Sequence, residues 1–196
     1  MKFTDDRYAA ERSQFELALR MIGHEARTGT ITACTGLSDD RIRKLYSRYF
    51  CTSGGSTIKR RRGKSPRQVA NFVGSAAQQL ESTTLLALFC ANLLLRIDAD
   101  RRVFPSWPRP DVDYGHRVCR AYETYLSLHA APKLSFEQAW SLLSNISHND
   151  ELFLSVCQDC DAPYVQDAYA LDQAQCPGCV IGGAPRRSGG QLARVP

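Results

Sequence analysis

The stretch ITACTGLSDDRIRKLYSRY, residues 31–49, contains the pattern that decides the fold of the first third of the chain. Gly36 is a turn residue, and the serine that follows it at position 38 can cap the first N–H groups of a helix. Asp39 and Asp40 come next, and carboxylates suit the positive end of a helix dipole. The stretch therefore predicts a helix that starts at Ser38.

This predicted helix has two distinct faces. Leu37 and Ile42 have the spacing of a hydrophobic staple, which would fix the direction in which the chain enters the helix. The expected buried stripe is Ile42, Leu45, Tyr46 and Tyr49. The opposite side is polar and basic, with Arg43 on its flank; it consists of Arg41, Lys44, Ser47 and Arg48.

The same stretch fits a helix-turn-helix. Apolar residues and a turn glycine occupy the positions that this motif requires, namely Ile31, Gly36, Leu37, Ile42 and Leu45. In such a motif the second helix enters the major groove, where arginine binds guanine and aspartate can accept a hydrogen bond from cytosine. The residues placed to reach the bases are Asp40, Arg41, Arg43, Lys44 and Ser47. An ordinary helical hairpin is the alternative, because Thr32 stands where a small residue is expected.

Positive charge is concentrated in one window. Residues 41–67 contain ten basic residues and no acidic one, whereas the rest of the chain has 15 basic and 20 acidic residues. Lysine and arginine that pair with phosphates release counterions, which supplies most sequence-independent affinity for nucleic acid. We expect DNA contacts from the basic residues of the second helix, Arg48 included, and from a loop over 52–66 that carries Lys59, Arg60, Arg61, Arg62 and Lys64. A solvated loop or a patch for an acidic protein or lipid remains an alternative.

The rest of the chain reads as further helices. One amphipathic helix is predicted over 5–26, ended by Gly29, and others over 68–97 and 114–130. Ser135 and Gln138 form a capping box that predicts one more. Leucines surround most of the helix over 68–97, so it should be buried or packed against a partner. The expected partner-binding residues are Leu85, Leu88, Phe89 and Leu93.

The four cysteines near the C-terminus have the spacing of a metal site. Cys157-x-x-Cys160 and Cys176-x-x-Cys179 are two CxxC pairs separated by fifteen residues, which is a zinc pattern. Four thiolates complete a tetrahedron around Zn²⁺ and leave no position for water or substrate. We therefore expect one structural zinc per chain. Two disulfides, an iron–sulfur cluster and unligated thiols are the alternatives.

The cysteine segment is acidic. Residues 141–179 contain six Asp and Glu and no Lys or Arg, and four thiolates around Zn²⁺ add a formal charge of −2. This surface should avoid phosphate, so we expect it to maintain shape rather than to contact DNA. The other cysteines lack ligand spacing and are expected to pack in the core; they are Cys34, Cys51, Cys90 and Cys119.

Several classes of protein are disfavoured. The Gly63-Lys64-Ser65 triplet lacks the earlier glycine of a phosphate-binding loop, since position 58 is Ile58. No HExxH or GxSxG motif occurs, so we expect no enzymatic activity. The longest apolar run has seven residues, too few for a membrane span. The charged N-terminus has no signal-peptide core, so we expect a cytoplasmic protein, in which clustered cysteines more often bind metal.

Five sequence blocks together resemble the family of the bacterial flagellar transcriptional regulator FlhC. They are GLSDDRIRKLY at 36–46, LLALFCANLLL at 85–95, AYETYL at 121–126, AWSLL at 139–143 and the paired CxxC motifs, which span about residues 10–180. The resemblance implies a cytoplasmic activator that forms a hetero-oligomer with FlhD, binds flagellar promoters and engages RNA polymerase holoenzyme. It also implies a structural zinc on Cys157, Cys160, Cys176 and Cys179, and DNA contacts from both the N-terminal helices and the zinc region.

The predicted fold class is mainly α, a helical domain with an N-terminal helix-turn-helix-like unit and a C-terminal four-cysteine zinc module. The expected division is a DNA-binding unit over 1–51, a basic arm over 52–67, a helical core and partner-binding region over 68–156, a zinc module over 157–180 and a basic tail over 181–196. The function predicted is the DNA-binding subunit of an activator that acts on double-stranded promoter DNA. A zinc-stabilised adaptor for an acidic protein, without nucleic acid, is the alternative.

Overall fold

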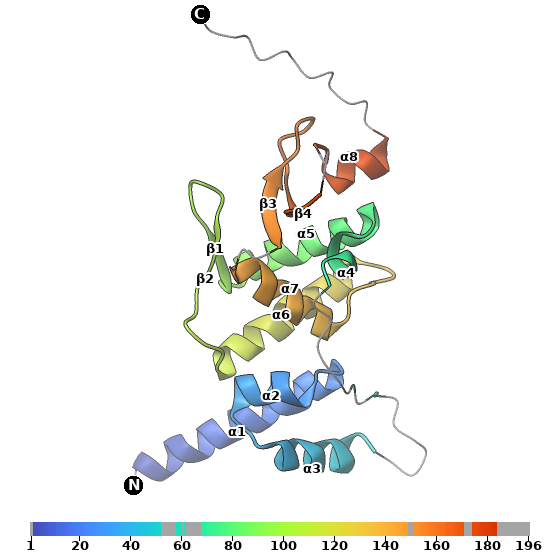
Figure 1. Ribbon diagram of the computed structural model, residues 1–196. Helices are drawn as coiled ribbons and strands as arrows, with labels where there is room; N and C mark the ends of the chain where they lie inside the picture. Colours follow the sequence, from blue (N-terminus) through green and yellow to red (C-terminus); the bar gives the residue numbers. More distant parts are fainter. Residues whose placement is uncertain are drawn as a thin grey trace, which may run out of the picture.

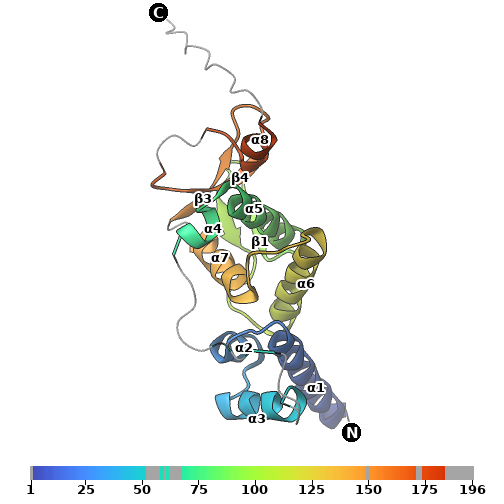
Figure 2. The same cartoon turned by 90° about the vertical axis from the view of Figure 1, so that its right-hand side faces the viewer.

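A computed structural model describes residues 2–51, 58–59, 61, 68–148, 151–170 and 174–183, with side chains from Arg7 onward. Within these residues the chain forms eight helices and two antiparallel two-stranded sheets. Helices α1–α3 lie at one end of the molecule and the β3–β4 hairpin with α8 at the other, with the remaining elements between them (Figures 1 and 2). The predicted mainly α-helical class, with a cluster of four cysteines near the C-terminus, is confirmed.

The N-terminal end consists of α1 (Lys2–Gly23), α2 (Thr28–Thr35) and α3 (Asp39–Tyr49). Helix α1 ends before the expected break at Gly29, because Glu25 takes a left-handed backbone conformation with φ 60°. Gly36 has φ 70°, which costs a glycine little, and turns the chain from α2 into α3. The predicted start of α3 is confirmed, since Ser38 Oγ accepts the N–H of Arg41 at 3.5 Å.

The three helices share one core. Ile31, Leu37 and Ile42 are buried, as are Leu17 and Ala18 on α1, and all belong to the main hydrophobic cluster. The prediction for Tyr49 is wrong: this last residue of α3 lines an open groove beside α1, and its side chain is 55% exposed. The apolar stripe of α3 therefore ends in solvent.

The helical region expected over 68–97 is three elements. Helix α4 (Ala70–Val73) ends at Gly74, and α5 (Ala76–Ala91) starts afresh because Ser75 Oγ accepts the N–H of Gln78 at 3.3 Å. After α5, Leu93 takes φ 58° and the chain forms a hairpin of β1 (Leu95–Ile97) and β2 (Val103–Pro105). Local caps and a turn thus divide a region that the sequence pattern predicts as one helical unit.

The expected partner surface on α5 is corrected by its burial. Leu85 and Phe89 are fully buried within the chain, where α5 packs against α6 and α7 and against β4. They cannot contact another protein in this fold. Leu88 is half-buried, and Leu93 is 62% exposed because its turn lies outside the core. Much of the leucine-rich surface of α5 is thus covered by the chain itself.

Helices α6 (Val112–Leu128) and α7 (Phe136–His148) complete the core. The predicted capping box is confirmed, since Gln138 Oε1 accepts the N–H of Ser135 at 2.9 Å and Ser135 Oγ accepts that of Gln138 at 3.4 Å. Gly115 lets α6 approach α1 and α2 closely: a Cβ there would lie 2.5 Å from Leu17 Cδ2.

Two ion pairs also connect the N-terminal helices to this core. Arg20 on α1 contacts Glu123 on α6 at 2.5 Å, and Arg27 approaches the buried Glu137 on α7 at 3.7 Å. Because Arg20 and Arg27 pair with carboxylates of the core helices, we do not count them as part of a surface for a polyanion.

The chain's two tryptophans lie around one hollow of about 320 Å³ beside the proline-rich segment 105–110. Tyr114 packs edge-on against Trp107, at 6.3 Å between ring centroids, and against Trp140, at 5.9 Å. Trp107 Nε1 donates to Leu93 O at 3.0 Å, which links this connector to the turn after α5.

The C-terminal part begins with β3 (Leu152–Val156) and β4 (Pro163–Asp167), followed by α8 (Pro177–Gly182). The hairpin thus starts before the module boundary expected at 157, and α8 includes the first two residues of the expected tail. Side chains of α5 bond to β4, since Gln79 Nε2 donates to Val165 O at 2.9 Å and Thr83 Oγ1 accepts the N–H of Val165 at 3.1 Å. Of the helices in the described ranges, none is both long and apolar enough to cross a membrane.

Candidate metal centre and candidate nucleic-acid interface

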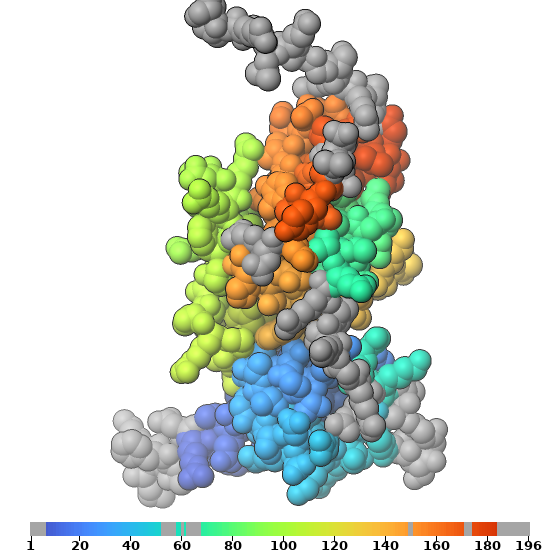
Figure 3. All heavy atoms as spheres, in the orientation of Figure 1, coloured from blue at the N-terminus to red at the C-terminus, as the bar shows by residue number. Residues whose placement is uncertain are grey.

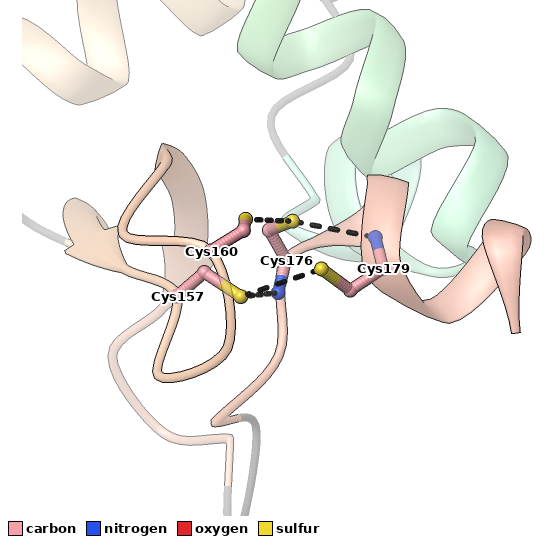
Figure 4. A group of neighbouring side chains, drawn as sticks. All are labelled: Cys157, Cys160, Cys176 and Cys179. Atoms are coloured by element: carbon pink, nitrogen blue, oxygen red, sulfur yellow. Dashed lines mark hydrogen bonds between the residues drawn. The ribbon is translucent and has the colours of Figure 1, made fainter. Parts of the chain in front are cut away.

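The sulfur atoms of Cys157, Cys160, Cys176 and Cys179 all lie within 4.8 Å of one another (Figure 4). The distance is 3.8 Å between the sulfurs of Cys157 and Cys179 and 3.6 Å between those of Cys160 and Cys176. Four sulfurs at about 2.3 Å from a central Zn²⁺ would be about 3.8 Å apart in a tetrahedron. The separations therefore suit a four-thiolate metal site, and the prediction that these four residues converge is confirmed.

Local backbone structure positions each pair of cysteines. Cys157 directly follows β3, and a turn closed by the Asp161 N–H to Cys157 O bond (3.0 Å) brings Cys160 back beside it. Cys176 is the N-cap of α8, with Pro177 at the first helical position, where its missing N–H has no cost. The two sequence motifs thus become a turn after a strand and a helix start.

Backbone N–H groups point at the sulfurs. The N–H of Cys176 donates to Cys157 Sγ at 3.2 Å, and the N–H of Cys179 donates to Cys176 Sγ at 3.4 Å. Burial raises the pKa of the Cys157 thiol, but backbone N–H donors outweigh it and lower that pKa to about 6. Hydrogen bonds to Cys160 and Cys176 raise the pKa of Cys179. One thiolate is thus stabilised by the backbone, and a cation is needed before all four can ionise together.

The surroundings of the cluster are acidic. Among the described residues from 151 to 183, the ionisable side chains other than cysteine and tyrosine are Glu151, Asp159, Asp161 and Asp167. Gln175 Nε2 donates to Asp159 at 2.6 Å and so ties the two cysteine turns together. Neither these carboxylates nor a four-thiolate site attracts phosphate.

The other four cysteines do not share one environment. Cys34 and Cys119 are buried, as expected for packing residues, and burial raises the pKa of each to about 12. Cys90 is half-buried, and burial also raises its pKa. Cys51 is exposed, so the packing prediction is wrong for this residue, which follows α3 at the point where the core ends.

The polar face predicted for α3 is exposed. Helix α3 forms the lower edge of the molecule in the space-filling view (Figure 3). The side chains expected to contact DNA are all solvent-accessible there; they are Arg41, Arg43, Lys44, Ser47 and Arg48. The structure therefore brings the first half of the predicted DNA-binding set together on one helix.

Two of the predicted cations have partners within the chain. Arg43 pairs with Asp40 at 3.2 Å, and this pair is exposed, so it contributes little and exchanges easily. Arg61 pairs with Glu25 at 2.8 Å, and the Lys59 backbone N–H donates to the same carboxylate at 3.3 Å. Tyr46 holds this segment on α3 by donating to Ile58 O at 2.5 Å. Arg60, Arg62 and Lys64 lie outside the described residues.

No known family model matches the chain. No curated protein sequence matches it either.

Two features of the α1–α3 end of the molecule were not predicted from the sequence. Glu25 pairs with Arg61 across 36 positions, and no local signal marks that contact. A groove between α1 and α3 is lined in part by Phe15, Leu19 and Tyr49, which sequence periodicity places in the core. The signal available was that Tyr49 is the last apolar residue before the helix ends.

Proposed function

We propose that the chain is the DNA-binding subunit of a bacterial transcription activator of the FlhC type, acting on double-stranded promoter DNA with an FlhD-like subunit. The observation that carries the proposal is the exposed face of α3, which follows a left-handed glycine turn and packs by its opposite face on α1 and α2. In a helix-turn-helix, a second helix so placed can lie in the major groove.

The chemistry of the α3 face fits a nucleic acid. Lys44 and Arg48 make no ion pair with any carboxylate in the described residues, so no internal ion pair has to break when they meet phosphate. Arg43 can exchange its exposed Asp40 partner for guanine, and Asp40 is then free to accept a bond from cytosine. Phosphate contacts would position the helix and base contacts would give specificity.

The cysteine cluster fits a structural zinc, one per chain. The donors are four thiolates, the ligand type that soft metals prefer, and their spacing matches the Zn–S tetrahedron. When bound, the metal would neutralise the thiolates and join β3 to α8. Its place at the opposite end of the molecule from α3 supports a role in shape or assembly instead of DNA contact (Figure 1).

Further proposals rest on the sequence resemblance: control of flagellar and related genes, and contact with RNA polymerase holoenzyme. The partner surface, with Leu85 and Phe89 excluded by their burial, has to use other residues. The members of the predicted set that are still available are the exposed Leu93, at the turn after α5, and the half-buried Leu88.

A salt titration of DNA binding tests the function. Electrophoretic mobility shifts with a flagellar promoter fragment, with and without the presumed partner, should show affinity that falls steeply with salt. Lys44→Ala should weaken binding to all sequences similarly and lower the salt slope by about 1, whereas Arg43→Ala should cost about 1–3 kcal/mol on the preferred site and relax base choice.

Arg120→Ala, on the exposed side of α6 away from α3, is the matched control and should leave binding unchanged. A flat salt slope, or equal losses for Lys44→Ala and Arg120→Ala, would reject the proposed DNA-binding face.

A further inference from the structure

A groove of about 430 Å³ runs between α1 and α3. Its floor is apolar, with Phe15 and Leu19 contributed by α1 and Leu45 and Tyr49 contributed by α3. Leu45 is buried, Phe15 and Leu19 are half-buried and Tyr49 is 55% exposed, so part of this floor faces solvent. The groove thus offers apolar surface that nothing in the described part of the chain covers.

The apolar floor continues along α1. Tyr8 precedes Phe15 by seven residues and Leu19 by eleven, so the three side chains lie on one face of the helix. Tyr8 is 72% exposed. At this end α1 projects past α2 and α3 (Figure 1). The surface is therefore elongated, with a length that suits a helix better than a small molecule.

The rim of the groove is cationic. Arg41, Lys44 and Arg48 line it, spaced by three and four residues along one side of α3, and no acidic residue lines it. Arg41 lies over the Phe15 ring at 4.9 Å from the centroid, and Arg48 is 5.9 Å from that of Tyr49. Within the described residues, none of the three forms an ion pair with a carboxylate.

An apolar floor with a cationic rim suits some binding partners better than others. A DNA backbone would use the cations but would gain nothing from the apolar floor. An amphipathic helix with acidic flanks matches both parts, since its apolar side chains would cover the floor and its carboxylates would pair with the rim. We propose that the α1–α3 groove binds an acidic amphipathic helix of a partner protein.

The groove shares Arg41, Lys44 and Arg48 with the proposed DNA-binding face, but it does not include the whole of that face. Arg43 and Ser47, four residues apart, lie on the flank of α3 away from Arg41 and Arg48, and neither lines the groove. Lys44 lies between the two flanks. Tyr49, which belongs only to the groove, and Arg43, which belongs only to the DNA-binding face, therefore test the two proposals separately.

The test uses the full chain and a synthetic helical peptide that carries leucines at i, i+3, i+4 and i+7 on one face and glutamates elsewhere. A peptide of the same composition with its leucines dispersed is the control. Calorimetric titration should show binding of the first and at least about tenfold weaker binding of the second. Tyr49→Ala and Arg48→Ala should each weaken binding by about tenfold, the effect of an interface anchor.

Arg43→Ala is the matched control on α3 and should leave peptide affinity unchanged, while Tyr49→Ala should leave DNA affinity unchanged. Circular dichroism checks that each variant keeps its helices; the exposure of Tyr49 and Arg48 predicts that it does. Equal affinity for the two peptides would overturn the proposal, because charge alone would then explain binding. A Tyr49→Ala loss as large for duplex DNA as for peptide would also overturn it and assign the groove to nucleic acid. Absence of DNA binding alone would overturn only the proposed function.

Discussion

A single methyl group added at Gly115 should disturb the packing interface between the N-terminal helices and the core. The added Cβ of Gly115→Ala would lie 2.5 Å from Leu17 Cδ2 on α1 and 3.0 Å from Cys34 Cβ on α2. Both neighbours are buried, with exposed fractions of 0% and 2%, so neither side chain can swing into solvent. Helix α1 or α6 therefore has to shift.

Two effects of opposite sign set the magnitude. Replacing glycine by alanine inside a helix stabilises it by about 1 kcal/mol. Overpacking a well-filled core costs about 1–3 kcal/mol. Because Leu17 is fully enclosed, the overpacking cost should exceed the helix gain, and we expect the free energy of unfolding to fall by about 1 kcal/mol.

Urea denaturation followed by circular dichroism measures this change. Gly29→Ala is the matched control, since Gly29 is also helical but a Cβ there meets nothing within 4 Å; it should leave stability unchanged or raise it slightly. In a Leu17→Ala background, Gly115→Ala should lose its cost, which a double-mutant cycle detects. If Gly115→Ala stabilises the protein as much as Gly29→Ala does, the close approach of α6 to α1 is refuted.

Three more outcomes are expected. Ser38→Ala should cost about 1 kcal/mol in a urea titration, because α3 loses its N-cap; an unchanged midpoint would contradict the cap. Chelation of the proposed zinc should release the amides near Cys157 in hydrogen-exchange measurements while those of α1 stay protected, whereas uniform release would argue against a local metal module. A hydrogen bond from Arg20, aided by His24, lowers the pKa of Glu123 to about 2 from 4.5. Ionised Glu123 thus stabilises the fold above about pH 4.5, and this contribution is lost as the pH falls toward 2. Glu123→Gln should flatten the stability–pH curve over that interval; a curve that keeps its wild-type slope would show that the ion pair is not responsible.

Helix starts that depend on neighbouring residues were predictable from sequence. Ser38 caps α3 and Ser135 with Gln138 caps α7, because such caps bond within three residues. The four-cysteine cluster was predictable for the same reason, since each CxxC pair closes in its own turn. Only the convergence of the two CxxC pairs depends on the tertiary fold. A separation of fifteen residues between such pairs is typical of zinc sites in which they converge.

Features set by tertiary contact could not be predicted. Whether the leucines of α5 face a partner or the chain's own core depends on where α6, α7 and β4 pack, and Leu85 and Phe89 turned out to be fully buried. The break between α4 and α5 was signalled by Gly74 and Ser75, which can end one helix and cap the next. The α1–α3 groove depends on how α1 and α3 pack against each other. The hydrophobic periodicity of each helix does not predict this arrangement.

The pairing of Trp107 and Trp140 around one hollow has a spectroscopic consequence. Indole emission from this protein arises from a single neighbourhood beside Tyr114, where α6 and α7 meet the proline-rich connector. An emission scan during heating thus reports when that junction loosens, and an event confined to α3 or to the cysteine turns would leave the signal nearly constant. A tryptophan introduced at Tyr169, which is 77% exposed beside the β3–β4 hairpin, would give the far end its own optical reporter.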